Sequence, residues 1–148
     1  MTRFLGPYGG VVYSVMRIVF AFLYLSHGLK WLFGAFGGRP VPIDFAFYQI
    51  LGLKITPLTA GVIELICGVL MVAGLFTSWA AFIASGEMAS AYFIAHVPRG
   101  GFVSIVNGSE ITVALCFGFL YLATQGDGPI SIGALLGSKT AQPVAVRR

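Results

Sequence analysis

Long apolar runs separated by short polar breaks dominate this chain, and four runs have lengths that suit membrane-crossing helices. They cover about residues 11–36, 58–76, 79–97 and 107–124. A helix needs roughly 20 mainly apolar residues to cross a hydrocarbon core of ~30 Å. Backbone groups in lipid must be hydrogen-bonded within the segment, and the alternation of a barrel strand is missing. The pattern predicts an all-α, polytopic membrane protein with a four-helix transmembrane bundle.

Local signals predict where these helices begin and end. Pro57 stands at the start of the second helix, where a missing N–H costs no hydrogen bond. Thr77 and Ser78 leave only a very short turn before the third helix, which predicts an antiparallel hairpin. Residues 126–129, GDGP, stop the fourth helix. We expect one transmembrane domain over residues 1–130, and a short surface segment with a flexible tail over 131–148.

The stretch between the first two helices contains VPIDFAFYQILGL, which is apolar but too short to cross a bilayer. We expect residues 37–57 to form an interfacial or re-entrant segment. Basic residues on the two sides give a small bias in orientation. The side of the termini carries Arg3, Lys139, Arg147 and Arg148, and the other side carries Arg39, Lys54 and Arg99. We therefore expect both termini to lie in the cytoplasm.

Composition supports a membrane protein and excludes several other classes. The chain is 57% hydrophobic and 9% charged, with a mean hydropathy of +0.90, whereas soluble domains are about 25% charged. Its net charge of +4 forms no basic cluster except Arg147 and Arg148 at the end, so we expect no nucleic-acid partner. Cys67 and Cys116 lie inside apolar runs without a CxxC motif, which favours buried, unreactive thiols.

Ionisable residues inside the apolar runs are the candidates for function. Glu87 lies in the middle of the third run, and a carboxylate at membrane depth costs at least about 2.5–3.5 kcal/mol unless it has a partner or a proton. Glu64 shares a helix face with Gly61 and Gly68, and Glu87 shares one with Ala84. Such small residues mark helix contacts, so both carboxylates should point into the bundle. The predicted polar interior consists of Arg17, His27, Lys30, Glu64, Glu87 and Glu110.

Depth along the helices places most of this set in the half of the bundle away from the termini. His96, Arg99 and Asn107 would form the rim of a pocket there. Structural alternatives stay open for several of these residues. Arg17 could instead form a structural ion pair with Glu64 or Glu87. His27 could instead form a hydrogen bond within the bundle. His96 and Arg99 also suit an ordinary interface.

Three further points bear on the chemistry of the pocket. Asn107 and Glu110 have the spacing of a helix N-cap and its capping partner. No histidine or carboxylate pair has the i, i+4 spacing of a metal site, so we expect no metal. Three buried carboxylates against the fixed cations Arg17 and Lys30 require a charged histidine or a protonated carboxyl group. That balance suits proton exchange.

An ordered set of short motifs resembles a known family. It comprises Arg17 followed by SHGLKW, then ELICGVLMVAGLFTSWAA, Met88 and Ala91, NGSE at 107–110, and FLYLATQGDGP. The chain resembles the DoxX family of small bacterial membrane proteins, named for similarity to a subunit of thiosulfate:quinone oxidoreductase. The family usually reads GGE where this chain has Ser109 in the middle. It often has an acidic residue after the terminal turn, where this chain reads Ser131, Ile132, Gly133.

The resemblance implies a four-helix bundle in the bacterial inner membrane and a link to redox systems. We expect an accessory subunit of a membrane redox or energy-transducing complex, with a membrane-protein partner or a second copy, lipid around it, and no covalent cofactor. Alternatively, the chain binds a quinone: His27 and Glu64 exchange protons with it, Arg17 or Lys30 holds an anionic form, and Tyr24, Trp31 and Tyr48 line the ring site. A small carrier or channel is the second alternative. We do not expect a standalone enzyme.

Overall fold

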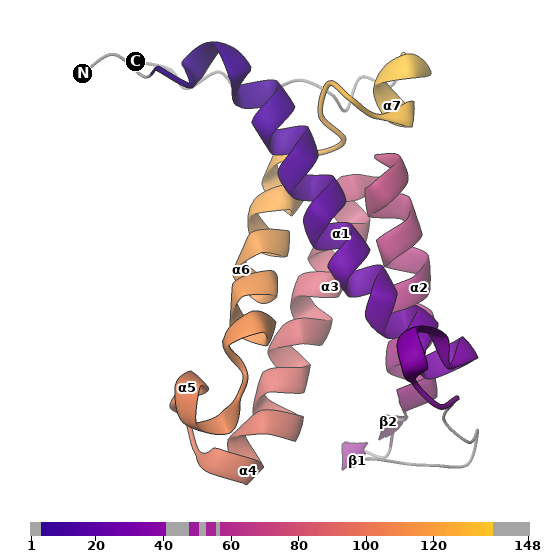
Figure 1. Cartoon of the computed structure of the whole chain (residues 1–148), viewed down its shortest axis with the longest axis vertical. Helices are drawn as coiled ribbons and strands as arrows, with labels where there is room; N and C mark the ends of the chain where they lie inside the picture. The colour runs from indigo at the N-terminus through magenta and orange to yellow at the C-terminus, as the bar shows by residue number, and fades with distance from the viewer. Residues whose placement is uncertain (1–3, 41–47, 51–52, 56, 138–148) are drawn as a thin grey trace.

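The computed structural model describes residues 4–40, 48–50, 53–55 and 57–137, and they form a predominantly helical fold (Figure 1). The longest helices are α1 (Gly9–Phe33), α2 (Pro57–Ala73), α3 (Thr77–Ala91) and α6 (Glu110–Gln125). Helix α1 packs mainly against α2, and α3 packs mainly against α6. The all-α prediction therefore holds for most of the described chain.

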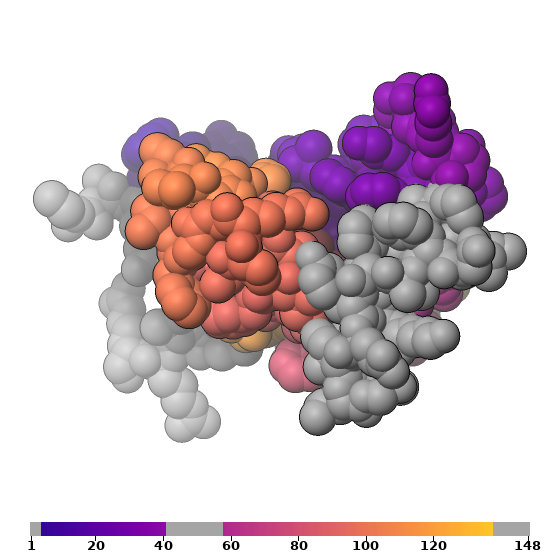
Figure 2. Space-filling model, turned by 90° about the horizontal axis from the view of Figure 1, so that it is seen from below, coloured from indigo at the N-terminus to yellow at the C-terminus, as the bar shows by residue number. Residues whose placement is uncertain are grey.

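Short elements occupy the two ends of this helical body (Figure 1). At one end lie η1 (Gly6–Tyr8), the turn between α2 and α3, and α7 (Ile132–Leu135); we call this the terminal end. At the other, the loop end, lie η2 (Ala35–Gly37), the strands β1 (Tyr48–Ile50) and β2 (Leu53–Ile55), α4 (Val97–Gly100) and α5 (Ser104–Asn107). Seen from below, α4 and α5 lie on the opposite side of the loop end from the last turn of α1 and η2 (Figure 2).

Glycines in the left-handed region set several helix ends, and they correct some predicted boundaries. Gly34 has φ 68°, so α1 ends at Phe33 rather than at residue 36. Gly74 has φ 67°, and the turn between α2 and α3 uses residues 74–76. Thr77 and Ser78, predicted as that turn, are instead the first residues of α3.

The start of α6 also differs from the prediction. Asn107 ends the short helix α5, and Gly108 with φ 70° turns the chain before α6 begins at Glu110. The side chain of Asn107 accepts a hydrogen bond from the backbone N–H of Ser109 at 3.0 Å. Ser109 occupies the N-cap position and no side chain caps the helix there. The predicted capping pair of Asn107 and Glu110 is therefore wrong.

The segment between α1 and α2 is only partly described. Residues 41–47, 51–52 and 56 lie outside the described chain, as do 138–148 of the predicted tail. Strands β1 and β2 pair antiparallel, with Gln49 opposite Lys54. The predicted interfacial position of this segment remains a prediction.

Small residues bring the helices close together. A Cβ atom on Gly28 of α1 would lie 2.7 Å from the backbone nitrogen of Leu65, and one on Gly68 of α2 would lie 2.8 Å from Cβ of Leu25. Lipid gives no hydrophobic drive for helix association, so such close backbone contact is what holds membrane helices together. The buried apolar core consists of Ala21, Tyr24, Cys67, Met71, Ala80, Ala81, Ala84, Met88, Leu115, Phe119 and Leu122.

The outward faces of the helices are apolar. Large exposed side chains include Val15, Phe22, Ile66, Val69, Trp79, Phe82, Phe117 and Leu120. A soluble monomer rarely exposes contiguous apolar surface on this scale. By length and composition, one described helix, Gly6–Phe33, is long enough to cross a membrane, and the apolar helices Leu58–Ala73 and Glu110–Gln125 are shorter.

Candidate functional site

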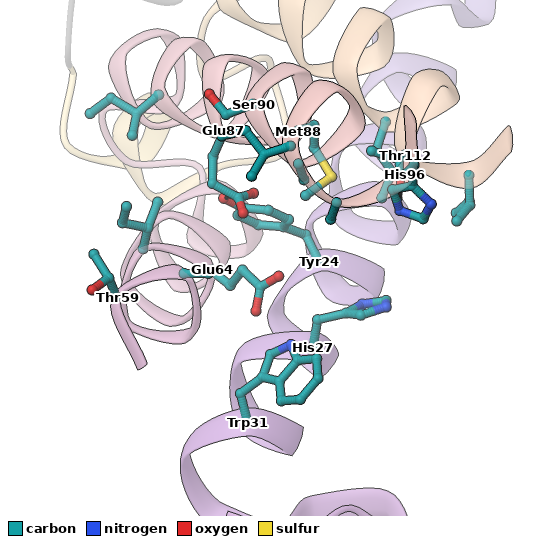
Figure 3. A pocket seen from close by; sticks show the side chains of 18 of the residues that line it. Tyr24, His27, Trp31, Thr59, Glu64, Glu87, Met88, Ser90, His96 and Thr112 are labelled. Carbon is teal, nitrogen blue, oxygen red and sulfur yellow. Dashed lines mark hydrogen bonds between the residues drawn. The ribbon is translucent and has the colours of Figure 1, made fainter. Parts of the chain in front are cut away.

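A cavity of about 570 Å³ opens among α1, α2, α3, α6 and the segment that continues α3 toward the loop end. Its volume falls in the range of small-molecule sites. Apolar side chains form most of the wall, and polar groups from different helices face into it (Figure 3). The polar and aromatic lining consists of Tyr24, His27, Trp31, Thr59, Glu64, Glu87, Ser90, His96, Arg99 and Thr112.

Glu64 is the most deeply buried charged group of this cavity. Only 5% of the residue is exposed, and its Oε2 atom is buried without a hydrogen-bond partner. It lies on the same face of α2 as Gly61 and Gly68, where α1 approaches closely. An unpaired polar group in such a place has a substantial desolvation cost. Its carboxyl group points into the cavity beside Tyr24 (Figure 3).

Glu87 reaches the same space from α3 and is held by a tyrosine. The Tyr24 hydroxyl donates a hydrogen bond to Oε2 of Glu87 at 3.3 Å. Tyr24 is 1% exposed, and its ring packs edge-on against Phe119 with centroids 5.0 Å apart. Within the described chain, no lysine or arginine forms an ion pair with Glu64 or Glu87. The described lining therefore contains two carboxyl groups that form no ion pair, and Arg99 is the one lysine or arginine among its residues.

His27 and Trp31 lie one turn apart on α1, and both line the cavity (Figure 3). Nδ1 of His27 lies 3.0 Å from the carbonyl oxygen of Leu23. A carbonyl oxygen only accepts, so Nδ1 carries the proton and donates it there. In the neutral ring Nε2 is then the acceptor, available to a molecule in the cavity.

His96 connects the cavity wall to the loop end. It is the last residue of a π-helical turn, η3 (Tyr92–His96), that joins α3 to α4. Its Nδ1 lies 3.2 Å from the carbonyl oxygen of Asn107, and its Nε2 lies 3.3 Å from Oγ1 of Thr112 on α6. Single π-helical turns occur often at functional sites, because they change which side chains face a cavity.

The structure brings together only part of the predicted polar set. His27, Glu64, Glu87, His96 and Arg99 line the cavity. Lys30 and Glu110 are exposed and lie outside the lining, and Asn107 contributes to the rim only through its contacts with His96 and Gly101. Nζ of Lys30 lies 5.8 Å from the ring centroid of Trp31.

Arg17 lies far from the cavity, at the terminal end of α1. It is 1% exposed, and its guanidinium donates hydrogen bonds to the carbonyl oxygens of Asp127 and, at 2.7 Å, Ile130. Neither Glu64 nor Glu87 is its partner, so the predicted ion pair is wrong. Arg17 is buried in the interior, but it does not line the cavity that contains His27.

The chain around Asp127 forms a second polar centre, which we call the Arg17 junction: Arg17, Thr77, Asp127, Ile130 and Ser131. Asp127 is 3% exposed, and its Oδ1 accepts the backbone N–H of Thr77 at the start of α3, 2.9 Å away. Ser131 caps α7 through the N–H of Ala134 at 3.0 Å. Ser131 and Gly133 at the start of the predicted surface segment are buried, whereas Ile132, Leu135 and Leu136 are exposed.

Sequence reasoning missed Thr112, Asp127 and Ser131. Asp127 has a visible signal, because it is one of five acidic residues in the chain and follows an apolar helix directly. The GDGP sequence around it predicts only a helix stop. Thr112 has no such signal, since a threonine inside an apolar helix often bonds to its own backbone. Within the described chain, no three metal-ligating side chains gather in one place.

Comparison with known proteins shows the family. Residues 12–97 match the family model described as DoxX. The chain belongs to the DoxX family. An uncharacterized protein of Haemophilus influenzae is 36% identical over 125 residues, which cover 80% of this chain and 86% of that protein. No solved structure shows a significant match.

The DoxX match includes most of the cavity but not all of it. It contains Tyr24, His27, Glu64, Glu87 and His96, whereas α6 with Thr112 lies beyond its last matched residue. Membership in this family supports a membrane protein.

Proposed function

We propose that this DoxX protein is a multi-pass protein of the bacterial inner membrane whose four long helices cross the bilayer as a bundle. The apolar outward faces and the length of Gly6–Phe33 support this proposal. Helices α2 and α6 have 17 and 16 residues, or about 25 Å at 1.5 Å per residue. Local thinning of the bilayer accommodates such a shortfall at modest cost. We place both termini in the cytoplasm on the bias of the basic residues.

Within that membrane, we propose a role as an accessory subunit that binds a quinone head group for a redox partner. The observation that carries this role is Glu64, which is buried and unpartnered in a cavity with aromatic walls. When protonated, Glu64 donates a hydrogen bond to a quinone carbonyl, and neutral His27 accepts one from a quinol hydroxyl. Tyr24 and Trp31 supply ring contacts.

The cavity also has groups for the protons that accompany quinol oxidation. A quinol that loses two electrons to the partner also releases two protons. Glu64 takes one proton, and Glu87, which accepts a hydrogen bond from Tyr24, takes the other. Arg17 and Lys30 do not line the cavity, so the proposal assigns neither of them to an anionic intermediate. The residues of the Arg17 junction do not line the cavity. No separate observation supports the alternative of a carrier or channel.

The test is purification of the native protein in a mild detergent, with co-purifying proteins and lipophilic molecules identified by mass spectrometry. We expect a quinone and a redox partner with the wild type. Glu64→Leu should lose the quinone, because leucine offers no hydrogen bond, while the matched surface change Glu110→Leu should keep it.

Two results would count against the proposal. A stable complex without quinone would support only the accessory role, and the polar groups of the cavity would then be structural. Free protein without quinone or partner, and an unchanged Glu64→Leu variant, would remove both parts.

A further inference from the structure

The two carboxyl groups of the cavity, when ionised, carry negative charge that a neutral quinone would not compensate. Glu64 and Glu87 face one space, and no described lysine or arginine pairs with either: Arg17 lies in its junction, Lys30 lies outside the lining, and Arg99 lines the cavity but is exposed. Glu64 is 5% exposed with a buried, unpartnered oxygen. A buried carboxylate requires a proton or a cation, and ionised Glu64 has no paired positive charge in the described chain.

We propose that this cavity binds a lipophilic organic monocation, meaning a quaternary or protonated-amine ion with apolar or aromatic substituents. This ligand class goes beyond the quinone role and does not depend on it. The charge would lie between Glu64 and Glu87, and the substituents would contact the apolar wall. The two carboxyl groups point into the same space beside Tyr24 (Figure 3).

The wall has the chemistry that such ions need. Ile63, Ile83 and Leu115 offer apolar contact, and Met88 adds a polarisable thioether. The rings of Tyr24 and Trp31 lie in the lining and attract cations through their π faces. The volume of about 570 Å³ accommodates a drug-sized ligand. Attraction between opposite charges is much stronger in this low-dielectric space than in water.

Protons compete with the cation for the same carboxylates. The titratable and charged groups around them are Tyr24 and His27 from α1, Cys67 from α2, His96 from η3 and Arg99 from α4, while α6 presents Thr112. Protonation of the carboxylates opposes cation binding. Binding should therefore strengthen as the pH rises, and cation binding should release protons.

The probe pair is tetraphenylphosphonium and tetraphenylborate, which share a shape and carry opposite charges. Binding is measured by calorimetry on the full-length protein in nanodiscs of neutral lipid, against empty nanodiscs. We expect tetraphenylphosphonium to bind at least about tenfold more tightly than tetraphenylborate, because only the cation is attracted to the carboxylates. Equal affinity for both ions would indicate apolar partition and would overturn the proposal.

Variants assign the effect to the cavity. Glu64→Gln removes the charge with little change of shape, and we expect at least about tenfold weaker cation binding. Glu110→Gln is the matched control, because Glu110 is exposed and outside the lining; its binding should equal wild type. Glu64→Asp keeps the charge and should keep most of the binding, which provides a second test if Glu64→Gln folds poorly. Loss in Glu110→Gln, or full binding in a folded Glu64→Gln, overturns the proposal.

The same variant separates this proposal from the quinone role. Glutamine can still donate a hydrogen bond to a quinone carbonyl, so Glu64→Gln retains quinone while it loses the cation. Quinone binding without cation binding in the wild type would therefore overturn only this inference, and the reverse would overturn only the quinone role.

Discussion

Two buried charges at different levels of the helical body have different surroundings. Arg17 is 1% exposed, and its two terminal nitrogens donate hydrogen bonds to the carbonyl oxygens of Asp127 and Ile130, although its Nε has no partner. Glu64 is 5% exposed, and one of its oxygens has no partner at all. Buried polar groups are normally satisfied, because leaving them unpaired is costly. The Arg17 junction therefore serves the fold, whereas the cavity keeps unused binding capacity.

The largest effect should come from breaking the junction. Arg17→Met leaves the carbonyl oxygens of Asp127 and Ile130 without their donors and a buried Asp127 without the nearby cation. Removal of one partner from a buried charged pair costs about 3–5 kcal/mol. We expect a large drop in the thermal midpoint in detergent, and Arg99→Met, an exposed change, serves as the control. An unchanged midpoint would show that the junction is not structural.

A smaller effect should come from forcing α1 away from α2 beside the cavity. Gly28→Ala places a Cβ 2.7 Å from the backbone nitrogen of Leu65, which cannot move alone. Overpacking of this kind costs about 1–3 kcal/mol. Gly86→Ala is a suitable control, since nothing lies within 4 Å of its added Cβ. Both are compared by thermal unfolding, and equal midpoints would contradict the close helix contact.

Tyr24→Phe tests a hydrogen bond that positions a cavity carboxyl group. It removes the hydroxyl that donates to Glu87 but keeps the ring against Phe119. A hydrogen bond to a charged acceptor contributes about 1.5–3 kcal/mol at most, and a neutral one about 0.5–1.5 kcal/mol. We expect a loss near the smaller figure by chemical unfolding, together with altered ligand affinity. Altered affinity without altered stability would assign Tyr24 to binding alone.

The smallest effect on stability should come from Glu64→Gln, and this sharpens the contrast with Arg17. Since Oε2 of Glu64 has no partner to lose, we expect the thermal midpoint to stay within the range of surface changes or to rise. Tetraphenylphosphonium affinity should fall in the same sample. A midpoint loss as large as that of Arg17→Met would mean that Glu64 supports the fold.

The cavity was easier to predict from the sequence than the junction. Glu64 and Glu87 share helix faces with small residues, and helical periodicity alone turns those faces inward. The partners of Arg17 are backbone carbonyl oxygens after a turn, and every residue type has such a carbonyl. A sequence pattern cannot show which carbonyl oxygens gather around a guanidinium. The ion-pair prediction failed for that reason.

Helix boundaries show the same limit on a smaller scale. Hydropathy located the apolar runs, but Gly34 and Gly108 moved the end of α1 and the start of α6 through positive φ values. A glycine in an apolar run fits either a helix contact or a helix end. Gly28 and Gly68 are contacts, whereas Gly34 is an end. Only the packed neighbours distinguish the two uses.

The π-helical turn at Tyr92–His96 sets the rotational phase of everything that follows it in this part of the chain. One residue corresponds to about 100° of rotation in an α-helix. Deletion of a single residue there would restore ordinary helical phase and swing Arg99 away from the rim, while Glu87, upstream, would keep its direction. The extra residue therefore changes the direction of the side chains that follow it. As a result, one continuous helical stretch directs Glu87 into the cavity from its first part and places Arg99 at the cavity rim from its second.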